Sequence, residues 1–318
     1  MQRSVRTWKK MVRVLYIVNP AGHGGAGIEA WKQFQTLWAE RIDPDDVIVT
    51  KRAGQAREIA ASRHDHDVLV AVGGDGTANE IMSGIMERQE PRPKMAIVPG
   101  GTGNDIARQV GIRTVDDAVV ALRDGHDRAF DIVQVSYQAA GRNEQRHAFL
   151  HAIAGFSSIP MVKPWMKRLL GPKGAYYMGT LLQIVAYKAP HMTVRSEGQE
   201  YSGRAYIVVA GNTEWSAGGS MCLSPGARVD DGEMNVTVIP AQSRFRMTTR
   251  LFPKIASGSH IHEPGVLYFP AREVVVLSEP PVPLELDGDL FGTTPATFTI
   301  CPLSLRIVSP EKPYEKTA

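Results

Sequence analysis

The feature that most constrains this chain is a three-part pattern that occurs twice in close succession. In AVGGDGTANEIM (71–82) and IVPGGTGNDIAR (97–108), an apolar run ends in glycines and threonine, and helix-forming residues follow. Apolar runs without polar alternation are typical of strands buried on both faces, as in a parallel sheet. Strand, loop and helix in that order form the unit of a doubly wound α/β fold. The pattern therefore predicts such a fold for the N-terminal part of the chain.

The rest of the N-terminal part continues this alternation. Because strands and helices alternate, we expect a parallel sheet covered by helices on both faces, within an α/β nucleotide domain that spans residues 11–134. Strands are predicted at 12–18, 46–51, 67–72 and 95–98, and helices at 27–40, at 54–63, from about Ala78 and from about Asn104.

Beyond about residue 130 the chain changes to short strands separated by turn-rich segments. Such a series is typical of an antiparallel sandwich, so residues 135–302 are expected to form a β-rich, sandwich-like domain. A last strand at 305–308 could return to the first domain, which residues 303–312 would then complete. The predicted strands lie at 130–138, 147–155, 204–212, 233–240, 273–279 and 296–302, and helical patches at 173–186 and about 243–257.

Composition restricts the classes of protein to which the chain can belong. Its 318 residues suit two domains, and 43% hydrophobic with 22% charged residues is the balance of a globular protein with hydrophobic cores. A net charge of +3 is too small to indicate nucleic acid but is compatible with an anionic membrane surface. Two cysteines without metal-ligand spacing, and no apolar run of about 18 residues, favour a cytoplasmic protein without a transmembrane helix.

The glycine loops predict a phosphate site. A loop that leaves a strand and enters a helix presents free backbone N–H groups at the positive end of the helix dipole, and glycine lets a phosphate approach them closely. A third such loop, NPAGHGGAG (19–27), follows the first strand. Three loops at the carboxyl edge of one sheet would surround one polyphosphate. The alternative is that the glycines only permit tight turns, and neither standard nucleotide fingerprint is present.

Together these motifs resemble the catalytic domain of the diacylglycerol kinase family, which includes bacterial lipid kinases and sphingosine and ceramide kinases. The resemblance begins with the Asn-Pro pair after the first strand, VGGDGTANEIMSGI (72–85) and PGGTGNDIAR (99–108). It continues through VAGNTEWSAGGSMCLSPGARVDDGEMNV (209–236) and LELDGD (284–289), so it covers about residues 12–308. It implies a kinase that uses ATP and Mg²⁺ to phosphorylate a hydroxyl of a diacylglycerol-like or sphingoid lipid.

The resemblance also assigns residues to the nucleotide and the metal. Asp75 would act through Mg²⁺, because a carboxylate beside a triphosphate needs a cation between them; the alternative is an aspartate that bonds its own turn. Asp231 matches the carboxylate that helps hold magnesium in the family, with a hairpin turn as its alternative. Asn104 and Asp105 could cap the following helix or support the site. The residues that would contact ATP are Asn19, Pro20, Ala21, Gly22, His23, Thr50, Gly74, Asp75, Gly76, Thr77, Ala78, Asn79, Glu80 and Thr102.

The motif LELDGD carries the catalytic chemistry that the resemblance implies. A lipid hydroxyl must lose its proton near the γ-phosphate, and a carboxylate within hydrogen-bond reach can accept or orient that proton. The family commonly has Asp-Gly-Glu at this place, with the glutamate as proton acceptor. This chain has Asp289 there instead, so the base is either Asp289 or Asp287. The alternative is an Asp-Gly turn of an ordinary hairpin.

Residues 161–188 predict contact with a membrane. Lys163, Lys167 and Arg168 lie beside Trp165, a mixture that suits a bilayer interface. The alternative, a core helix with a charged outer face, is favoured for residues 175–186. The expected partners are a lipid substrate, an anionic membrane surface and ATP, with no nucleic acid; the protein would be peripherally membrane-associated, and a homodimer is left open.

Two other functions remain open. One is a kinase of a soluble substrate such as NAD, because NAD kinases carry similar GGDGT loops. The other is a non-catalytic relative that binds nucleotide or lipid, which the departure to Asp-Gly-Asp suggests.

Overall fold

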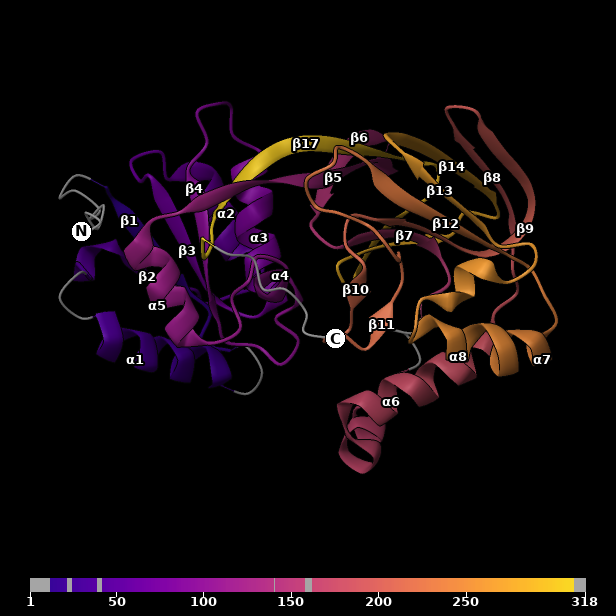
Figure 1. The fold of residues 1–318 in the computed structure, drawn as a ribbon, viewed down its shortest axis with the longest axis horizontal. Helices are drawn as coiled ribbons and strands as arrows, with labels where there is room; N and C mark the ends of the chain where they lie inside the picture. Colours follow the sequence, from indigo (N-terminus) through magenta and orange to yellow (C-terminus); the bar gives the residue numbers. More distant parts are fainter. Residues whose placement is uncertain (1–11, 22–24, 39–41, 140, 158–161, 312–318) are drawn as a thin grey trace, which may run out of the picture. The chain divides into compact units, whose positions relative to one another are not determined.

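The computed structural model describes residues 12–21, 25–38, 42–139, 141–157 and 162–311 (Figure 1). The chain divides into two compact units, residues 1–132 with 302–318 and residues 133–301. Strands β5 (Asp127–Ala139) and β17 (Ala296–Val308) each run from one unit into the other. In the part of the chain that the structure describes, no helix is both long and apolar enough to cross a membrane.

A parallel sheet forms the centre of the first unit. Val14 pairs with Val68 and Val18 with Val72, so the first and third strands end at the same level. The inner strands at 14–18, 68–73 and 94–99 are buried on both faces, which explains why their sequences show no polar alternation. The strand order is β2 (Val47–Val49), β1 (Val14–Val18), β3 (Val68–Gly73), β4 (Lys94–Pro99) and the end of β17.

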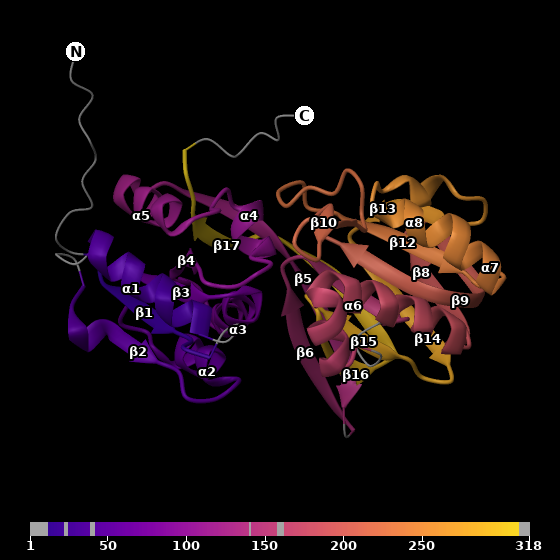
Figure 2. The ribbon, with the colours of Figure 1, turned by 90° about the horizontal axis from the view of Figure 1, so that it is seen from below.

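Helices cover both faces of this sheet, which confirms the predicted doubly wound α/β fold (Figures 1 and 2). On one face lie α1 (Ala26–Trp38) and α5 (Val115–Asp124), and on the other lie α2 (Gln55–Ser62) and α3 (Asp75–Met86). A short helix, α4 (Asp105–Gln109), follows β4. The strand order reverses its direction between β1 and β3, and the carboxyl ends of two such strands border the crevice in which α/β folds bind ligands.

The sequence of α1 shows why this face of the sheet is covered. Trp31, Phe34 and Trp38 recur at helical spacing, so they lie on one side of the helix and are buried. Tyr16 of β1 packs against Trp31 and Phe34, with ring centroids 5.5 and 5.8 Å away, and its hydroxyl oxygen accepts a 3.1 Å hydrogen bond from the Trp38 indole. This aromatic cluster holds the helix above the strand that ends at the predicted nucleotide site.

The second unit is a sandwich-like arrangement of antiparallel strands, as predicted. The long strand β9 pairs with β8 along its first half and with β7 and β12 along its second half. Val208, Val236 and Phe298 are among the fully buried side chains of its core. The strands are β6 (Arg142–Ala148), β7 (His151–Gly155), β8 (His191–Ser196), β9 (Gln199–Gly211), β10 (Trp215–Ser216), β11 (Met221–Cys222), β12 (Met234–Pro240), β13 (Leu267–Ala271), β14 (Glu273–Glu279), β15 (Pro283–Leu286) and β16 (Asp289–Thr293).

Three predicted boundaries are wrong, and the structure gives a physical reason for each. The strand predicted at 147–155 is interrupted at Phe149 and Leu150, because the backbone N–H groups of both bond the carboxylate of Asp287. The strands predicted at 296–302 and 305–308 form one strand, β17, which continues through Leu303 at a φ of 47°. Helix α3 begins at Asp75 rather than near Ala78, because Gly74 is already its extended N-cap.

A helical layer covers one side of the second unit's sheet (Figures 1 and 2). It consists of α6 (Pro164–Ala186), which is kinked at Gly171, then α7 (Arg244–Arg246), a π-helical turn (Met247–Leu251) and α8 (Phe252–Ile255). Ile184 of α6 shares a hydrophobic cluster with Leu251 and Phe252. Two segments that are distant in sequence therefore pack as one layer.

Candidate functional site

A pocket of about 810 Å³ opens in the first unit at the carboxyl edge of its sheet. The loops after β1, β2, β3 and β4 each supply part of its wall, as expected for a ligand site of this fold. The lining residues are Asn19, Pro20, Ala21, Thr50, Lys51, Arg52, Ala53, Ala56, Gly74, Asp75, Gly76, Thr77, Glu80, Gly101, Thr102 and Gly103.

Asn19 joins the loop after β1 to the start of α3. Its backbone N–H donates to the carbonyl of Val72 at 3.0 Å, and its side-chain amide donates to the hydroxyl of Thr77 at 3.0 Å. Its side-chain oxygen accepts the N–H of Ala21 at 3.1 Å. These bonds hold the two loops at the strand-order reversal, where the first N–H groups of α3 are free of intrahelical partners.

The two glycine loops touch each other, which explains part of their glycine content. A Cβ atom on Gly101 would lie 2.6 Å from the Cα atom of Gly74, and one on Gly74 would lie 3.2 Å from the Cα atom of Gly101. The side chain of Asn104 accepts from the N–H of Gly101 at 2.8 Å and donates to its carbonyl at 2.7 Å. Asn104 thus closes the second loop, and its side chain makes no capping bond to α4.

We expect the substitution Gly101→Ala to destabilise the protein by roughly 1–3 kcal/mol, because the new methyl group overpacks the contact between the loops. Thermal or urea denaturation measures the change. The matched control is Gly76→Ala, whose Cβ atom would meet nothing within 4 Å inside α3. That variant should gain about 0.5–1 kcal/mol, since alanine is favoured over glycine in a helix. Equal stability of Gly101→Ala and the wild-type protein would contradict the steric argument.

Asp75 is a partly buried carboxylate in the pocket wall. Its Oδ1 atom accepts the N–H of Ile106 at 2.9 Å, and its Oδ2 atom would lie 2.9 Å from a Cβ atom on Gly103. Burial raises the pKa of Asp75, and the charge of Asp105 raises it further, while the backbone N–H groups of Ile106, Asp105 and Asn104 lower it. Mg²⁺ is usually held by one or two carboxylates together with substrate phosphates. A carboxylate beside the first amides of a helix fits that mode.

Five more predicted nucleotide residues line the pocket, namely Pro20, Ala21, Gly74, Gly76 and Thr77. The remaining ones divide into three groups. Thr50, Thr102 and Glu80 line the pocket, but the carboxylate of Glu80 is already bonded to the N–H groups of Gly54 and Ala56 at 2.9 and 3.1 Å, so it fixes the start of α2. Ala78, a core residue with 2% exposure, and Asn79, which accepts a bond from Ser83, are not part of the lining. Gly22 and His23 lie outside the described residues.

The sequence analysis missed the two cations of the pocket. Lys51 and Arg52 follow β2 directly and line the same wall as Thr50. The guanidinium of Arg52 forms an ion pair with Glu58 at 2.5 Å, while the Lys51 side chain is exposed. A basic pair at the end of a parallel strand was the signal in the sequence, because the carboxyl ends of parallel strands share one edge.

In the second unit, Asp287 and Gly288 form the two-residue turn between β15 and β16. Leu286 pairs with Asp289 across this turn, and both turn residues have positive φ angles, 47° and 94°. The hairpin that the sequence left as an alternative is therefore present. The carboxylate of Asp287 also accepts three backbone N–H groups, from Phe149 and Leu150 at 2.8 Å each and from His151 at 3.0 Å.

Two further carboxylates stand beside Asp287. Asp289 is exposed at the start of β16, and Glu285 lies on β15, opposite Ile153. Burial raises the pKa of Glu285, the hydroxyl of Ser157 opposes this by donating to the carboxylate, and the charges of Asp289 and Asp287 raise it further. Sequence reasoning missed Glu285. The signal was strand alternation, which puts this residue on the face opposite the buried Leu284 and Leu286.

Asp231 lies on an exposed turn of the second unit. Its carboxylate accepts the N–H of Glu233 at 3.1 Å, as an aspartate does in a turn. Within the described ranges, no three side chains of His, Cys, Asp or Glu are grouped so that they could hold a metal ion. The magnesium role of Asp231 therefore stays a prediction.

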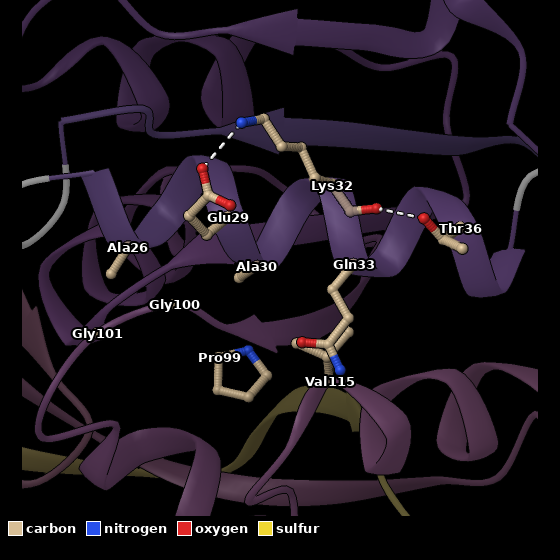
Figure 3. Close-up of a pocket in the computed structure, with 10 residues that line it drawn as sticks. All are labelled: Ala26, Glu29, Ala30, Lys32, Gln33, Thr36, Pro99, Gly100, Gly101 and Val115. Atoms are coloured by element: carbon tan, nitrogen blue, oxygen red, sulfur yellow. Dashed lines mark hydrogen bonds and ion pairs between the residues drawn. The ribbon is translucent and has the colours of Figure 1, made fainter.

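A second hollow of about 500 Å³ lies between α1 and α5 in the first unit (Figure 3). Gly100 and Gly101 border it, so one glycine loop is shared between this hollow and the pocket that contains Asp75. Its polar groups pair with one another: Lys32 with Glu29 at 2.8 Å, and Gln33 with Asp116 at 3.2 Å. The pocket with Asp75 is the better phosphate site, because Lys51, Arg52 and the start of α3 line it.

Comparison with known families adds to this geometry. Residues 13–135 match the family described as "Diacylglycerol kinase catalytic domain". Residues 162–309 match the family described as "YegS C-terminal NAD kinase beta sandwich-like domain". The two matches cover the α/β part and most of the β-rich part of the chain.

Individual relatives agree with these matches. The chain is 29% identical to the diacylglycerol kinase of Staphylococcus haemolyticus over 326 residues, which cover 97% of this chain and 91% of the relative. It is 30% identical to that of Staphylococcus aureus over 255 residues, 78% of this chain and 77% of the relative.

Solved structures from Bacillus anthracis share the fold. The crystal structure of a diacylglycerol kinase from this organism has a TM-score of 0.67 at 21% identity, covering 94% of this chain and 97% of its own. Another crystal structure from the same organism has a TM-score of 0.74 at 22% identity, over 94% of this chain and 98% of its own.

Proposed function

The chain belongs to the diacylglycerol kinase family, and on that premise we propose that it transfers the γ-phosphoryl group of ATP to a hydroxyl of a diacylglycerol-like or sphingoid lipid. Its enzyme class is that of a phosphotransferase with an alcohol group as acceptor. The observation that carries the proposal is the 30% identity to a diacylglycerol kinase over 77% of that relative's length. The test is a radiolabelled-ATP assay against a mixed lipid extract, followed by identification of the product.

The proposal assigns the triphosphate to the pocket of the first unit. The N-terminal amides of α3 and the backbone N–H groups of Thr102 and Gly103 would donate to phosphate oxygens. Asp75 would hold Mg²⁺ there, and a bound Mg²⁺ ion neutralises the charge that develops on the phosphate oxygens during transfer. Lys51 and Arg52 would bring positive charge to the same wall.

We expect Lys51→Met to raise the dissociation constant for ATP about tenfold or more, because a charge-assisted bond to a phosphate would be lost. Isothermal titration with ATP or a non-hydrolysable analogue measures this change. The matched control is Lys32→Met, which removes an exposed lysine of the same unit that lies outside the pocket. An unchanged ATP affinity in Lys51→Met would remove this residue from the nucleotide site.

The proposal assigns the acceptor hydroxyl to the carboxylates of the β15–β16 hairpin. Asp289 is the better base, because its carboxylate is exposed at the turn, whereas three backbone N–H groups already occupy most of the acceptor positions of Asp287. Asp287 instead positions residues 149–151 and the turn itself. The substrate is drawn from an anionic membrane to which the protein binds peripherally.

A kinase of a soluble substrate is the second candidate. The match of residues 162–309 to an NAD kinase-like β-sandwich favours it, and the phosphate pocket would serve either function. The same radiolabelled-ATP assay with NAD in place of lipid separates the two. Phosphorylation of NAD without phosphorylation of lipid would replace the proposed function with this one.

A further inference from the structure

The most exposed large apolar side chains of the protein gather on the helical layer of the second unit. Among the described residues, those exposed by more than 60% are Trp165 and Leu169 of α6, at 62% and 74%, and Phe245 of α7, at 76%. Singly exposed apolar residues are common on protein surfaces, but such a concentration on one layer is typical of an interaction surface.

The same layer carries positive charge without negative charge. None of the chain's 33 acidic residues falls within 161–188 or 241–262, the two segments from which the layer is built. Arg244 and Arg250 are exposed on either side of Phe245 in the sequence. The acidic residue that follows the second segment, Glu263, is buried and paired with Lys254 and Arg246, so it does not offset the charge of Arg244 and Arg250.

Phe245 is held outward by the packing beneath it. Met247, Leu251 and Phe252 are buried against Ile184 of α6, and they share this cluster with Ile239 of β12. Ser243 caps α7 by accepting the N–H of Arg246 at 3.2 Å. Helix α7, which bears Phe245, is therefore anchored on the helical layer that contains α6 (Figure 2), and the Phe245 ring is exposed rather than packed in the core.

We propose that α7 is a second membrane-docking element, in which Phe245 enters the acyl boundary of an anionic phospholipid bilayer while Arg244 and Arg250 contact lipid phosphates. Charge complementarity selects this occupant: two segments that carry cations and no acidic residue attract an anionic bilayer, whereas the same segments of a second copy would be repelled. An aromatic ring between basic residues suits the membrane–water interface, which is apolar on the side of the acyl chains and hydrated on the side of the headgroups. This inference deepens the proposed lipid kinase function and rests on it.

The test is sedimentation with vesicles of phosphatidylcholine containing about a third of phosphatidylglycerol, without ATP. Phe245→Ala should weaken binding about tenfold, from the loss of one buried aromatic side chain. At low salt, the double variant Arg244→Gln/Arg250→Gln should bind vesicles about 25-fold more weakly than the wild-type protein does. At 1 M salt the two proteins should bind almost equally, because surface charge is screened. Matched controls are Leu37→Ala and Arg123→Gln/Arg142→Gln, which remove exposed side chains outside the helical layer and should bind as the wild-type protein does.

Two results would overturn the proposal. One is wild-type vesicle affinity in both Phe245→Ala and the double arginine variant. The other is a change in oligomeric state of Phe245→Ala, measured by analytical ultracentrifugation, with unchanged vesicle binding, which would make this face a protein interface. Activity of the wild-type protein towards water-soluble, short-chain forms of both a diacylglycerol and a sphingoid lipid is measured separately. Its absence would contradict the proposed function, whatever the vesicles show.

Discussion

Replacing Asp75 by asparagine is expected to lower kcat roughly 10³-fold, equivalent to about 4 kcal/mol of transition-state stabilisation. The reason is that this carboxylate of the pocket wall would bind Mg²⁺ at the phosphates, and a neutral amide binds this ion weakly. Asparagine retains an oxygen that can accept the N–H of Ile106, but the backbone N–H groups of Asp105 and Asn104 also bond this carboxylate, so we expect a loss of stability smaller than that of an alanine variant. Steady-state kinetics over a range of Mg²⁺ concentrations, together with a melting curve, measure both expectations.

Two variants sharpen this test. Asp75→Ala should lose activity and also about 1–3 kcal/mol of stability, because a buried N–H is left without its acceptor. Asp105→Asn removes a neighbouring carboxylate that is not part of the pocket lining, so it should reduce kcat much less. Near wild-type activity of Asp75→Asn at saturating Mg²⁺ would show that this carboxylate does not hold the metal.

The sequence could predict those residues of the nucleotide pocket whose position follows from the order of the strands in the sheet. Because Asn19, Thr50, Gly74 and Thr102 each follow a parallel strand, the α/β fold alone brings them to one edge. The sequence could not show that Gly74 and Gly101 are in mutual contact, since that depends on the distance between two loops. Lys51 was missed because the resemblance named only the threonine before it.

The second unit was less predictable because its contacts link distant segments. LELDGD reads equally as a catalytic motif and as a hairpin, and only the bonds from Phe149, Leu150 and His151 show what Asp287 does. These bonds also explain the break between β6 and β7, which no local pattern could reveal. Phe245 was predicted only as part of a helical patch, because its exposure follows from the packing of the π-helical turn and α8 against α6.

The hydrogen bonds of Asp287 distinguish a structural role for this residue from the catalytic role proposed for Asp289, which the sequence alone could not do. In Asp287→Asn, an NH₂ group replaces one of the oxygens that accept N–H groups, so at least one buried donor loses its acceptor. The cost should be about 1–3 kcal/mol, which lowers Tm by several degrees for a unit of this size. Any loss of activity in this variant would therefore accompany a loss of stability.

Asp289→Asn should behave differently, because its carboxylate is exposed and makes no comparable set of bonds to the core. We expect kcat to fall about 10²–10⁴-fold, the usual contribution of a general base, with unchanged Tm and little change in ATP affinity. The measurements are lipid phosphorylation kinetics, ATP titration and melting curves on Asp289→Asn, Asp287→Asn and Glu285→Gln in parallel. A wild-type rate in Asp289→Asn, or a failure that comes mainly from lost ATP affinity, would contradict this assignment. If only Glu285→Gln loses kcat at full stability, the base is the half-buried carboxylate on β15, because Glu285 is then the one side chain of the three whose charge the reaction requires.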